Sequence, residues 1–248
     1  MKRECINYLD QTSPVVMELL NNNSLVLPVG TIEQHGPHLP LSVDIDITVD
    51  ICKKLCCRKN WVMGPQIMYA ARSLPQSGGG SDFPGTISIN GKVLIDYFVD
   101  IISSFCQMGL KNLYIINGHY ENEAFIFEAI EICRQRNLLK GMSIVALSWW
   151  SAIDDEFIKK KFNNNFVGWH AEHAGFVETS LMLYLRPEKV RFINEECSNI
   201  PMAGIYYYSD EKKDENANGT LSSSKGATSK AGEEFFDHIC KRLEMILV

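Results

Sequence analysis

The sequence predicts an α/β protein in which helices cover both faces of a mainly parallel β-sheet. Short apolar runs alternate with longer amphipathic segments, which is the pattern of consecutive βαβ units. Hydrophobic residues make up 46% and charged residues 22% of the 248 residues, as in globular proteins with a substantial core. Because no second apolar region follows the polar stretch at 208–230, we expect one domain spanning residues 1–248, with that stretch as a surface excursion.

The apolar runs and the periodic segments define the expected elements. Strands are expected at 24–29, 61–63, 112–116 and 143–147, with 67–69 as an alternative continuation of the second. The clearest helix covers 91–108, where apolar residues recur at intervals of three and four between a capping Asn90 and a terminating Gly109. The other helices are expected at 45–58, 122–135, 154–162, 176–185 and 229–247.

The charge balance and the short apolar runs exclude several classes of partner. The formal net charge of -6 and the pI of about 5.6 disfavour nucleic acid and anionic membranes. The apolar runs are too short to cross a bilayer, and the N-terminal residues do not form a signal peptide. We expect a cytoplasmic protein whose eight cysteines are reduced thiols, with Cys52 and Cys56 buried as apolar residues rather than paired on zinc.

Residues with chemical function gather where the predicted strands end. The segments that follow the four strands contain GTIEQHGPHLPLSVDID, PQSGGGSDFPGT, NGHYEN and SWWS. The loops at the opposite ends of the strands carry no comparable groups. Ligands of open parallel sheets bind outside the carboxyl ends of the strands. We therefore expect a binding site where these four segments meet.

Two of these segments contain the ligand types of a transition-metal site. The candidates are Glu33 and His35 after the first strand, His119 and Glu121 after the third, and a further carboxylate from Asp44 or Asp46. Imidazole and carboxylate groups without thiolate suit Zn²⁺ or Mn²⁺, and five groups are too many for one tetrahedral zinc ion. The pattern favours a two-metal site that holds a hydroxide between its ions, in preference to separately packed histidines.

A third cluster, WHAEH followed by ETS, offers groups that would act on a substrate. His173 is a natural proton shuttle beside a metal-activated water. Glu178 has either a role of that kind or that of a favourable charge at a helix N-terminus, and Glu172 fits the second interpretation better.

Three of the four tryptophans lie on the same side of the predicted sheet as these groups. Trp149, Trp150 and Trp169 can wall a planar, uncharged ring, although core packing accounts for at least one of them. No arginine pair lies in the loops, which disfavours a strongly anionic substrate. The glycine run at 78–80 permits close backbone approach to a ligand but lacks the lysine of a P-loop.

Three longer segments, LPVGTIEQHGPHLPLSVDID, NGHYENEAFI and EHAGFVETSLML, resemble the creatininase (creatinine amidohydrolase) family, with a further resemblance at GTLSSSK, residues 219–225. EQHGPHLP and ETS are shared across the wider family, whereas SGGGSDFPGT and NGHYEN look more like creatininase proper. The resemblance implies a three-layer α/β/α sandwich and a binuclear site of Zn²⁺ and/or Mn²⁺. It also implies self-association as a homohexamer.

The resemblance further implies roles for individual residues. The metal ligands would be Glu33, His35, Asp44, His119 and Glu121, with Asp44 bridging the two ions. The substrate contacts would be Ser77, Tyr120, Trp150, Trp169 and His173. Two features differ from creatininase itself: His170 stands where creatininase has an acidic residue, and Pro37 and residues 39–40 follow the wider family.

The expected function is that of an amidohydrolase that opens a small cyclic amide, with creatinine and its product creatine as the first choice. A hydroxide held between the metal ions attacks the lactam carbonyl, Glu121 accepts a proton as general base, and His173 donates one to the leaving nitrogen. No redox or nucleotide cofactor is needed. Two alternatives remain open: another small amide, such as a formylamino-pyrimidine or a peptide-like amide, and a metal-binding relative that lacks catalysis.

Overall fold

The fold is built on a five-stranded parallel sheet. The computed structural model describes residues 4–74, 82–191, 202–205 and 218–247. The strands are β1 (Ile6–Asn7), β2 (Leu25–Val29), β3 (Val62–Met63), β4 (Asn112–Asn117) and β5 (Ser143–Ser148). They lie in the order β1-β3-β2-β4-β5, and every neighbouring pair is parallel. All residues of β2 are buried, as expected of a central strand covered on both faces.

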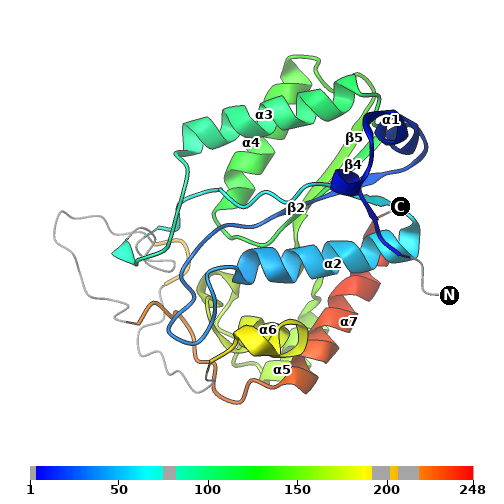
Figure 1. The fold of residues 1–248 in the computed structure, drawn as a ribbon. Helices are drawn as coiled ribbons and strands as arrows, with labels where there is room; N and C mark the ends of the chain where they lie inside the picture. Colours follow the sequence, from blue (N-terminus) through cyan, green and yellow to red (C-terminus); the bar gives the residue numbers. More distant parts are fainter. Residues whose placement is uncertain (1–3, 75–81, 192–201, 206–217, 248) are drawn as a thin grey trace.

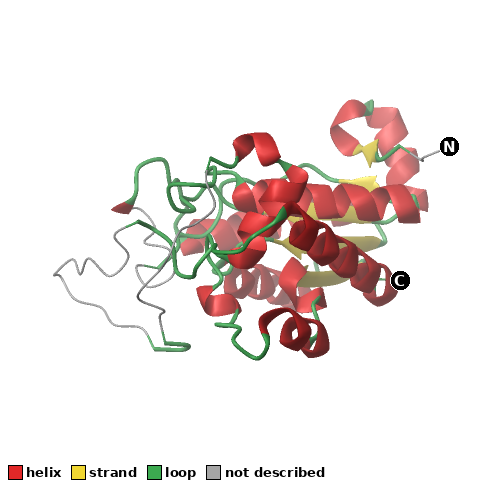
Figure 2. Cartoon of the chain, turned by 90° about the horizontal axis from the view of Figure 1, so that it is seen from below, coloured by secondary structure: helices red, strands yellow, loops and turns green. Residues whose placement is uncertain are grey.

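Helices cover both faces of this sheet (Figure 1). One face carries α1 (Ser13–Asn22), α3 (Gly91–Gln107) and α4 (Asn122–Gln135); the other carries α2 (Val43–Lys59), α5 (Asp155–Phe162), α6 (Phe176–Leu185) and α7 (Ser229–Ile246). Figure 2, viewed from the side of α5, α6 and α7, shows the sheet behind these helices. Each face has its own apolar core, with Phe98 in one and Phe235 in the other. The predicted three-layer sandwich is confirmed.

The strongly periodic segments fold as predicted, whereas short elements escape prediction. α4 and α6 have the predicted bounds, and α3 begins after Asn90, whose side chain accepts a hydrogen bond from the backbone of Lys92. β1 has only two residues, and α1 buries only Val16 and Leu20, so neither produces a clear pattern. Residues 67–69 do not continue β3 but contribute an isolated bridge to β2.

The described cysteines are free thiols, as predicted, and the described helices do not have the character of membrane spans. The seven cysteines in the described part of the chain carry free thiols, and Cys52 and Cys56 are buried in α2 as predicted. Among the described helices, none combines the length and the apolar character that a membrane span requires.

Gly232 lets α6 and α7 touch through their backbones. A Cβ atom at this position would overlap the carbonyl oxygen of Ser180 on α6. We expect Gly232→Ala to lower the free energy of unfolding by about 1–3 kcal/mol, because the helices must separate to admit the methyl group. Denaturant unfolding measures the change, with Lys230→Ala, an exposed position on the same helix, as the control. Equal stability of the two variants would contradict this account of the packing.

Candidate metal and substrate site

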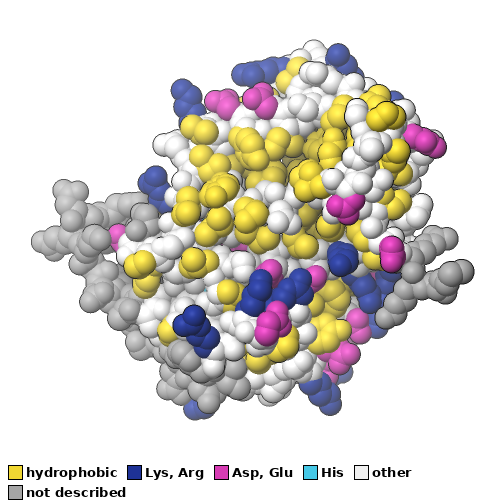
Figure 3. Space-filling model, in the orientation of Figure 1, with side chains coloured by type: hydrophobic (Ala, Val, Ile, Leu, Met, Phe, Trp, Pro, Cys, Tyr) yellow, Lys and Arg dark blue, Asp and Glu magenta, His cyan; other side chains and the backbone are white. Residues whose placement is uncertain are grey.

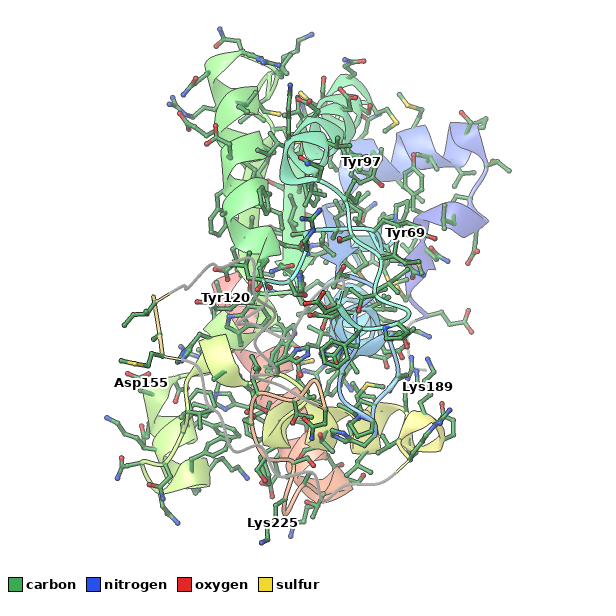
Figure 4. The ribbon with its side chains drawn as sticks, turned by 90° about the vertical axis from the view of Figure 1, so that its left-hand side faces the viewer. Tyr69, Tyr97, Tyr120, Asp155, Lys189 and Lys225 are labelled. Atoms are coloured by element: carbon green, nitrogen blue, oxygen red, sulfur yellow. The ribbon has the colours of Figure 1, made fainter. Side chains whose placement is uncertain are left out.

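The loops that follow β2, β4 and β5 meet at one edge of the sheet, as the sequence predicts. Figure 4 looks onto this edge and labels Tyr120, in the loop after β4. A pocket opens there, lined by residues from the loops after these strands, from the first turn of α2, from the segment 169–178 and from Leu221. The predicted convergence is therefore present for three of the four segments, and residues 75–81 of the fourth lie outside the described part of the chain.

Two glycines allow the sheet to approach the first turn of α2, which carries Asp44. A Cβ atom at Gly30, after β2, would lie 2.9 Å from the carbonyl carbon of Asp44. A Cβ atom at Gly118, after β4, would lie 2.7 Å from the Asp44 carbonyl oxygen. Both distances are shorter than van der Waals contact, so a larger residue at either position would push α2 away. The glycines thus keep Asp44 close to the ends of β2 and β4.

Asp44 is the centre of a buried cluster of carboxylates and imidazoles. Its Oδ1 lies 3.1 Å from Nε2 of His35, and its Oδ2 lies 3.2 Å from Nδ1 of His119. The same Nδ1 of His119 is 3.2 Å from Oε2 of Glu33. None of these four side chains is more than 4% exposed. The two oxygens of Asp44 therefore face two different imidazoles, the arrangement that a bridging carboxylate requires.

Asp46, the alternative that residue spacing leaves open, points elsewhere. Residues two positions apart on an α-helix lie on nearly opposite sides of it. Asp46 accordingly accepts a hydrogen bond from Ser42 and forms an ion pair with Lys189, whose Nζ is 2.6 Å away. The geometry selects Asp44 as the carboxylate of the cluster.

The cluster contains two sets of three donors that share Asp44. The sets are Glu33, Asp44 and His119, and His35, Asp44 and Glu178; within each, the donor atoms lie within 4.8 Å of one another. Glu178 comes from the first turn of α6, and its Oε2 is 3.7 Å from Nε2 of His35. The structure thus places Glu178 in the donor cluster. The sequence had left open whether this residue acts on the substrate or is a favourable charge at a helix N-terminus.

Glu121 lies at the edge of this cluster. Its Oε2 is 3.3 Å from Nε2 of His119, and its Oε1 accepts a hydrogen bond from the backbone of Leu74. Among the described residues, neither of the two donor sets that share Asp44 includes it. Glu121 also lines the pocket. Its predicted place among the metal ligands stays a prediction, and its position beside His119 in the pocket also suits proton exchange with a bound molecule.

Charges within the cluster hold protons on both imidazoles. Burial opposes a charge on His35, but Asp44 and Glu178 outweigh it and raise the pKa of His35 to about 10. Burial is likewise overcome at His119, where Glu33 and Asp44 raise the pKa well above the usual value. In the metal-free chain these protons balance the buried carboxylates. They supply the positive charge that bound metal ions would otherwise supply.

The described donors fit divalent cations. Three buried atoms, Nε2 of His35, Oδ2 of Asp44 and Nε2 of His119, have no hydrogen bond of good geometry within the described residues. Buried polar atoms are rarely left in that state in native proteins. Nitrogen and oxygen donors without thiolate are those that Zn²⁺ and Mn²⁺ accept. The cluster is therefore suited to bind divalent cations, which would satisfy these buried atoms.

We expect the affinity for Mn²⁺ to increase as the pH is raised from about 6 to 8. The ion must displace the proton of His35, with a pKa of about 10, and that of Glu178, whose pKa burial raises to about 8. The metal-free chain holds both protons at the lower pH, so raising the pH removes a competitor. Titration against a competing chelator at several pH values measures the trend. An affinity independent of pH would show that no proton is displaced.

Gln34 holds His173 beside the donor cluster. The amide orientation is defined, because the backbone of Gly36 donates to Oε1 over 2.9 Å while Nε2 donates to the carbonyl of Gly219 over 2.8 Å. The same Nε2 lies 3.1 Å from Nε2 of His173. An amide nitrogen only donates, so this ring nitrogen accepts, and the neutral imidazole carries its proton on Nδ1. Burial lowers the pKa of His173 to about 4, which keeps the ring neutral.

Residues 219–224 pack onto the site, and the prediction of a surface excursion was wrong for them. The backbone of Leu221 donates to the carbonyl of His173 over 3.1 Å, and Gly219 accepts the hydrogen bond from Gln34. The buried members of this segment are Thr220, Leu221, Ser222 and Ser224. Small polar residues can be buried when their polar groups are paired, and a hydropathy pattern does not reveal this. Residues 206–217 of the same stretch lie outside the described part of the chain.

Glu172 joins this segment to α6. Its Oε1 accepts a hydrogen bond from the backbone of Val177 in the first turn of α6, over 2.6 Å. Its Oε2 accepts another from Oγ of Ser222, over 3.1 Å. The first contact confirms the role at a helix N-terminus that the sequence favours for Glu172.

Aromatic rings form one wall of the pocket. Trp150 lies between Tyr120 and Trp169, with ring centroids 6.3 and 6.4 Å apart and interplanar angles of 21° and 25°. Trp149 packs edge-on against both tryptophans and is only 1% exposed, so it serves the core as well. Among the described residues that line the pocket, none is arginine or lysine. The wall is suited to a flat ring without strong negative charge.

The structure places most of the predicted substrate contacts together. The pocket is lined by Tyr120, Trp150, Trp169 and His173, and also by His170. Ser77 lies outside the described residues. Sequence reasoning missed Gln34 and also Ser73, whose hydroxyl donates to Oε1 of Glu33. For Gln34 the available signal was its position between two predicted ligands, whereas nothing in the sequence marks Ser73.

The profile of one protein family, described as "Creatininase: Creatinine amidohydrolase", matches residues 10–247. The chain belongs to the creatininase family. A creatinine amidohydrolase of Pseudomonas putida is 36% identical over 216 residues, which cover 84% of this chain and 82% of the relative. The chain is accordingly a hydrolase of carbon–nitrogen amide bonds.

Solved creatininase structures share the complete fold. A Zn-Zn form of a creatininase variant has a TM-score of 0.90 and 31% identity, covering 98% of this chain and 97% of its own. A creatininase Mn structure has a TM-score of 0.90 and 30% identity, covering 98% of both chains. Members of the creatininase family thus bind divalent metal ions, in agreement with the donors described above.

The chain is also similar to enzymes with other names. A 3-dehydro-scyllo-inosose hydrolase of Thermotoga maritima is 28% identical over 177 residues, which cover 69% of this chain and 52% of the relative. A mycofactocin precursor peptide peptidase of Mycobacterium tuberculosis is 29% identical over 178 residues, covering 68% and 61%. Family membership therefore leaves the substrate to be assigned from the pocket.

Proposed function

We propose that this chain is a metal-dependent amidohydrolase that converts creatinine and water into creatine, reversibly. The observation that carries the proposal is the position of Asp44, whose two oxygens face the two halves of the donor cluster. Glu33, Asp44 and His119 would hold one cation, and His35, Asp44 and Glu178 the other. When bound, such ions lower the pKa of a water molecule and polarise an amide carbonyl.

Two residues of the chain are assigned to proton transfer. Glu121 lines the pocket beside His119 and accepts a proton from the attacking water as general base. His173 presents the proton on its Nδ1, because Gln34 donates to Nε2, and passes it to the leaving nitrogen. Burial keeps His173 neutral, so for the proton that it passes to the leaving nitrogen it receives the one that Glu121 has accepted from the water.

The shape of the pocket and the similarity to a creatinine amidohydrolase both support creatinine as the substrate. It is a small, planar, uncharged lactam, and the wall formed by Tyr120, Trp150 and Trp169 offers flat apolar surfaces. The identity of 36% with a creatinine amidohydrolase supports the same assignment. The sequence motifs point the same way, since NGHYEN is closer to creatininase proper than to the wider family.

The direct test is hydrolysis of creatinine by the purified chain reconstituted with Mn²⁺ or Zn²⁺. We expect creatine to form, the activity to vanish on treatment with a chelator, and the addition of either metal to restore it. Bound metal without hydrolysis of any amide tested would instead favour a relative that lacks catalysis. No binding of metal would refute the proposal as a whole.

His170 supports one alternative substrate class. It lines the pocket at a position where creatininase proper has an acidic residue, and it alters the charge offered to a substrate. A panel of formylamino-pyrimidines and short peptide amides, assayed beside creatinine, separates the two classes. Faster hydrolysis of a formamide or peptide amide than of creatinine would show that the substrate is an amide of that other class.

We also propose that the chain forms a homohexamer in the cytoplasm. In Figure 3 apolar side chains gather on the part of the visible surface where Figure 1 shows α1 and α3. On α3 both Val93 and Tyr97 are more than 40% exposed, as are Tyr69 and Ile87 earlier in the chain. An exposed apolar patch favours a protein interface. Light scattering should give six times the chain mass of 28.1 kDa. A monomeric mass would contradict the proposal.

A further inference from the structure

Five thiols lie together at the end of α2 remote from Asp44. Cys52, Cys56 and Cys57 occupy the last turns of α2, Cys5 directly precedes β1, and Cys240 is on α7. Twelve residues of helix separate Asp44 from Cys56, which is about 18 Å at 1.5 Å per residue. These thiols therefore belong to neither the donor cluster nor the substrate pocket, and the proposed amide hydrolysis does not use them.

The strand register explains why Cys5 meets the last turn of α2. Ile6 in β1 pairs with Val62 in β3, so Cys5 lies beside Trp61. The backbone of Trp61 in turn donates to the carbonyl of Cys56 over 3.2 Å. The Cys5 side chain lies within hydrogen-bonding reach of the thiols of Cys56 and Cys57. Cys5 also packs against the apolar cluster that contains Cys56.

Cys5 and Cys56 differ from each other in the way that a reactive pair of thiols requires. The hydrogen bond from Cys56, helped by the charge of Lys53, lowers the pKa of Cys5 to about 7 against the effect of burial. Cys5 is half-buried, so a small oxidant can reach it, whereas Cys56 is only 1% exposed. Reactive thiols are those that are partly exposed and largely ionised near neutral pH.

We propose that Cys5 and Cys56 form a reversible disulfide when the chain meets a hydroperoxide. The Cys5 thiolate attacks the peroxide, forming an S–O bond as the O–O bond breaks and releasing hydroxide or alkoxide. The Cys56 sulfur then attacks the resulting sulfenic acid, forming the S–S bond, and its proton leaves with the displaced hydroxide as water. The two sulfurs lose two electrons to the peroxide, and a dithiol reductant reverses the change.

The disulfide would fasten the edge strand β1 to the end of α2. It closes a loop that contains α1, β2 and most of α2, and crosslinks that close long loops restrict the unfolded chain most. We expect the melting temperature to rise by roughly 5–10 °C on oxidation and to return on reduction. Creatinine turnover should change little, since Asp44 lies at the other end of the helix.

Peptide mapping of the wild-type chain after brief exposure to hydrogen peroxide tests the proposal without any substitution. The expected product is two hydrogen atoms lighter and contains a peptide pair linked through Cys5 and Cys56. The linkage should persist in Cys57→Ser, the matched control, and be absent in Cys5→Ser and Cys56→Ala. A linkage from Cys5 to Cys57, oxidation confined to other thiols, or no linkage at all would overturn it. Because the readout is mass, the result is independent of whether creatinine is the substrate.

Discussion

Replacing Glu121 by glutamine is expected to reduce turnover of the metal-loaded enzyme by roughly 10²–10⁴-fold, the range associated with loss of a general base. Glutamine has nearly the same shape, and its carbonyl oxygen can still accept the hydrogen bond from the backbone of Leu74. It cannot accept a proton from water. Since neither donor set that shares Asp44 includes Glu121 among the described residues, the variant should retain its metal ions and its fold.

Metal analysis together with steady-state kinetics distinguishes whether Glu121 acts as a general base or as a metal ligand. Full metal content with lost turnover supports a general base. Loss of metal together with turnover would restore Glu121 to the ligands, as the sequence motifs imply. Glu128→Gln, an exposed position further along α4, is the control for the loss of one negative charge. Unchanged turnover in Glu121→Gln would remove this residue from the mechanism.

The layered fold could be predicted from the sequence because the apolar residues of each long element follow the pattern of a single type of secondary structure. The helix at 91–107 and the buried strand at 25–29 are examples in which the local pattern and the final packing agree. β1 could not be found in this way. Its two residues are defined by pairing with Val62 and Met63, more than fifty positions along the chain.

The donor cluster was predictable to the extent that parallel strands deliver their ends to one edge of the sheet. Glu33, His35 and His119 follow from that rule alone. The choice between Asp44 and Asp46 needed the rotation of α2, and the place of Glu178 needed the packing of α6 against it. The burial of residues 219–224 depends on pairing with Gln34 and Glu172, which no local pattern encodes.

Replacing Asp44 by asparagine is expected to abolish binding of both metal ions, and creatinine turnover with it. The carboxylate belongs to both donor sets, one oxygen toward His35 and the other toward His119. Asparagine keeps the size of the side chain but offers only one oxygen and no charge. Removing the charge also leaves the protonated imidazoles less balanced, so a cation would be repelled more strongly.

Metal content and thermal unfolding together report the result. At a metal concentration about a hundredfold above Kd, the wild-type chain should melt roughly 5–10 °C higher than the metal-free chain. Asp44→Asn should show no such rise, while Asp46→Asn, two positions along the same helix, should keep it because Asp46 faces Lys189. Glu178→Gln should lose one ion and retain the other. If Asp44→Asn bound both ions, Asp44 would not be the bridge between them, and the two-metal assignment would have to be rebuilt on other groups.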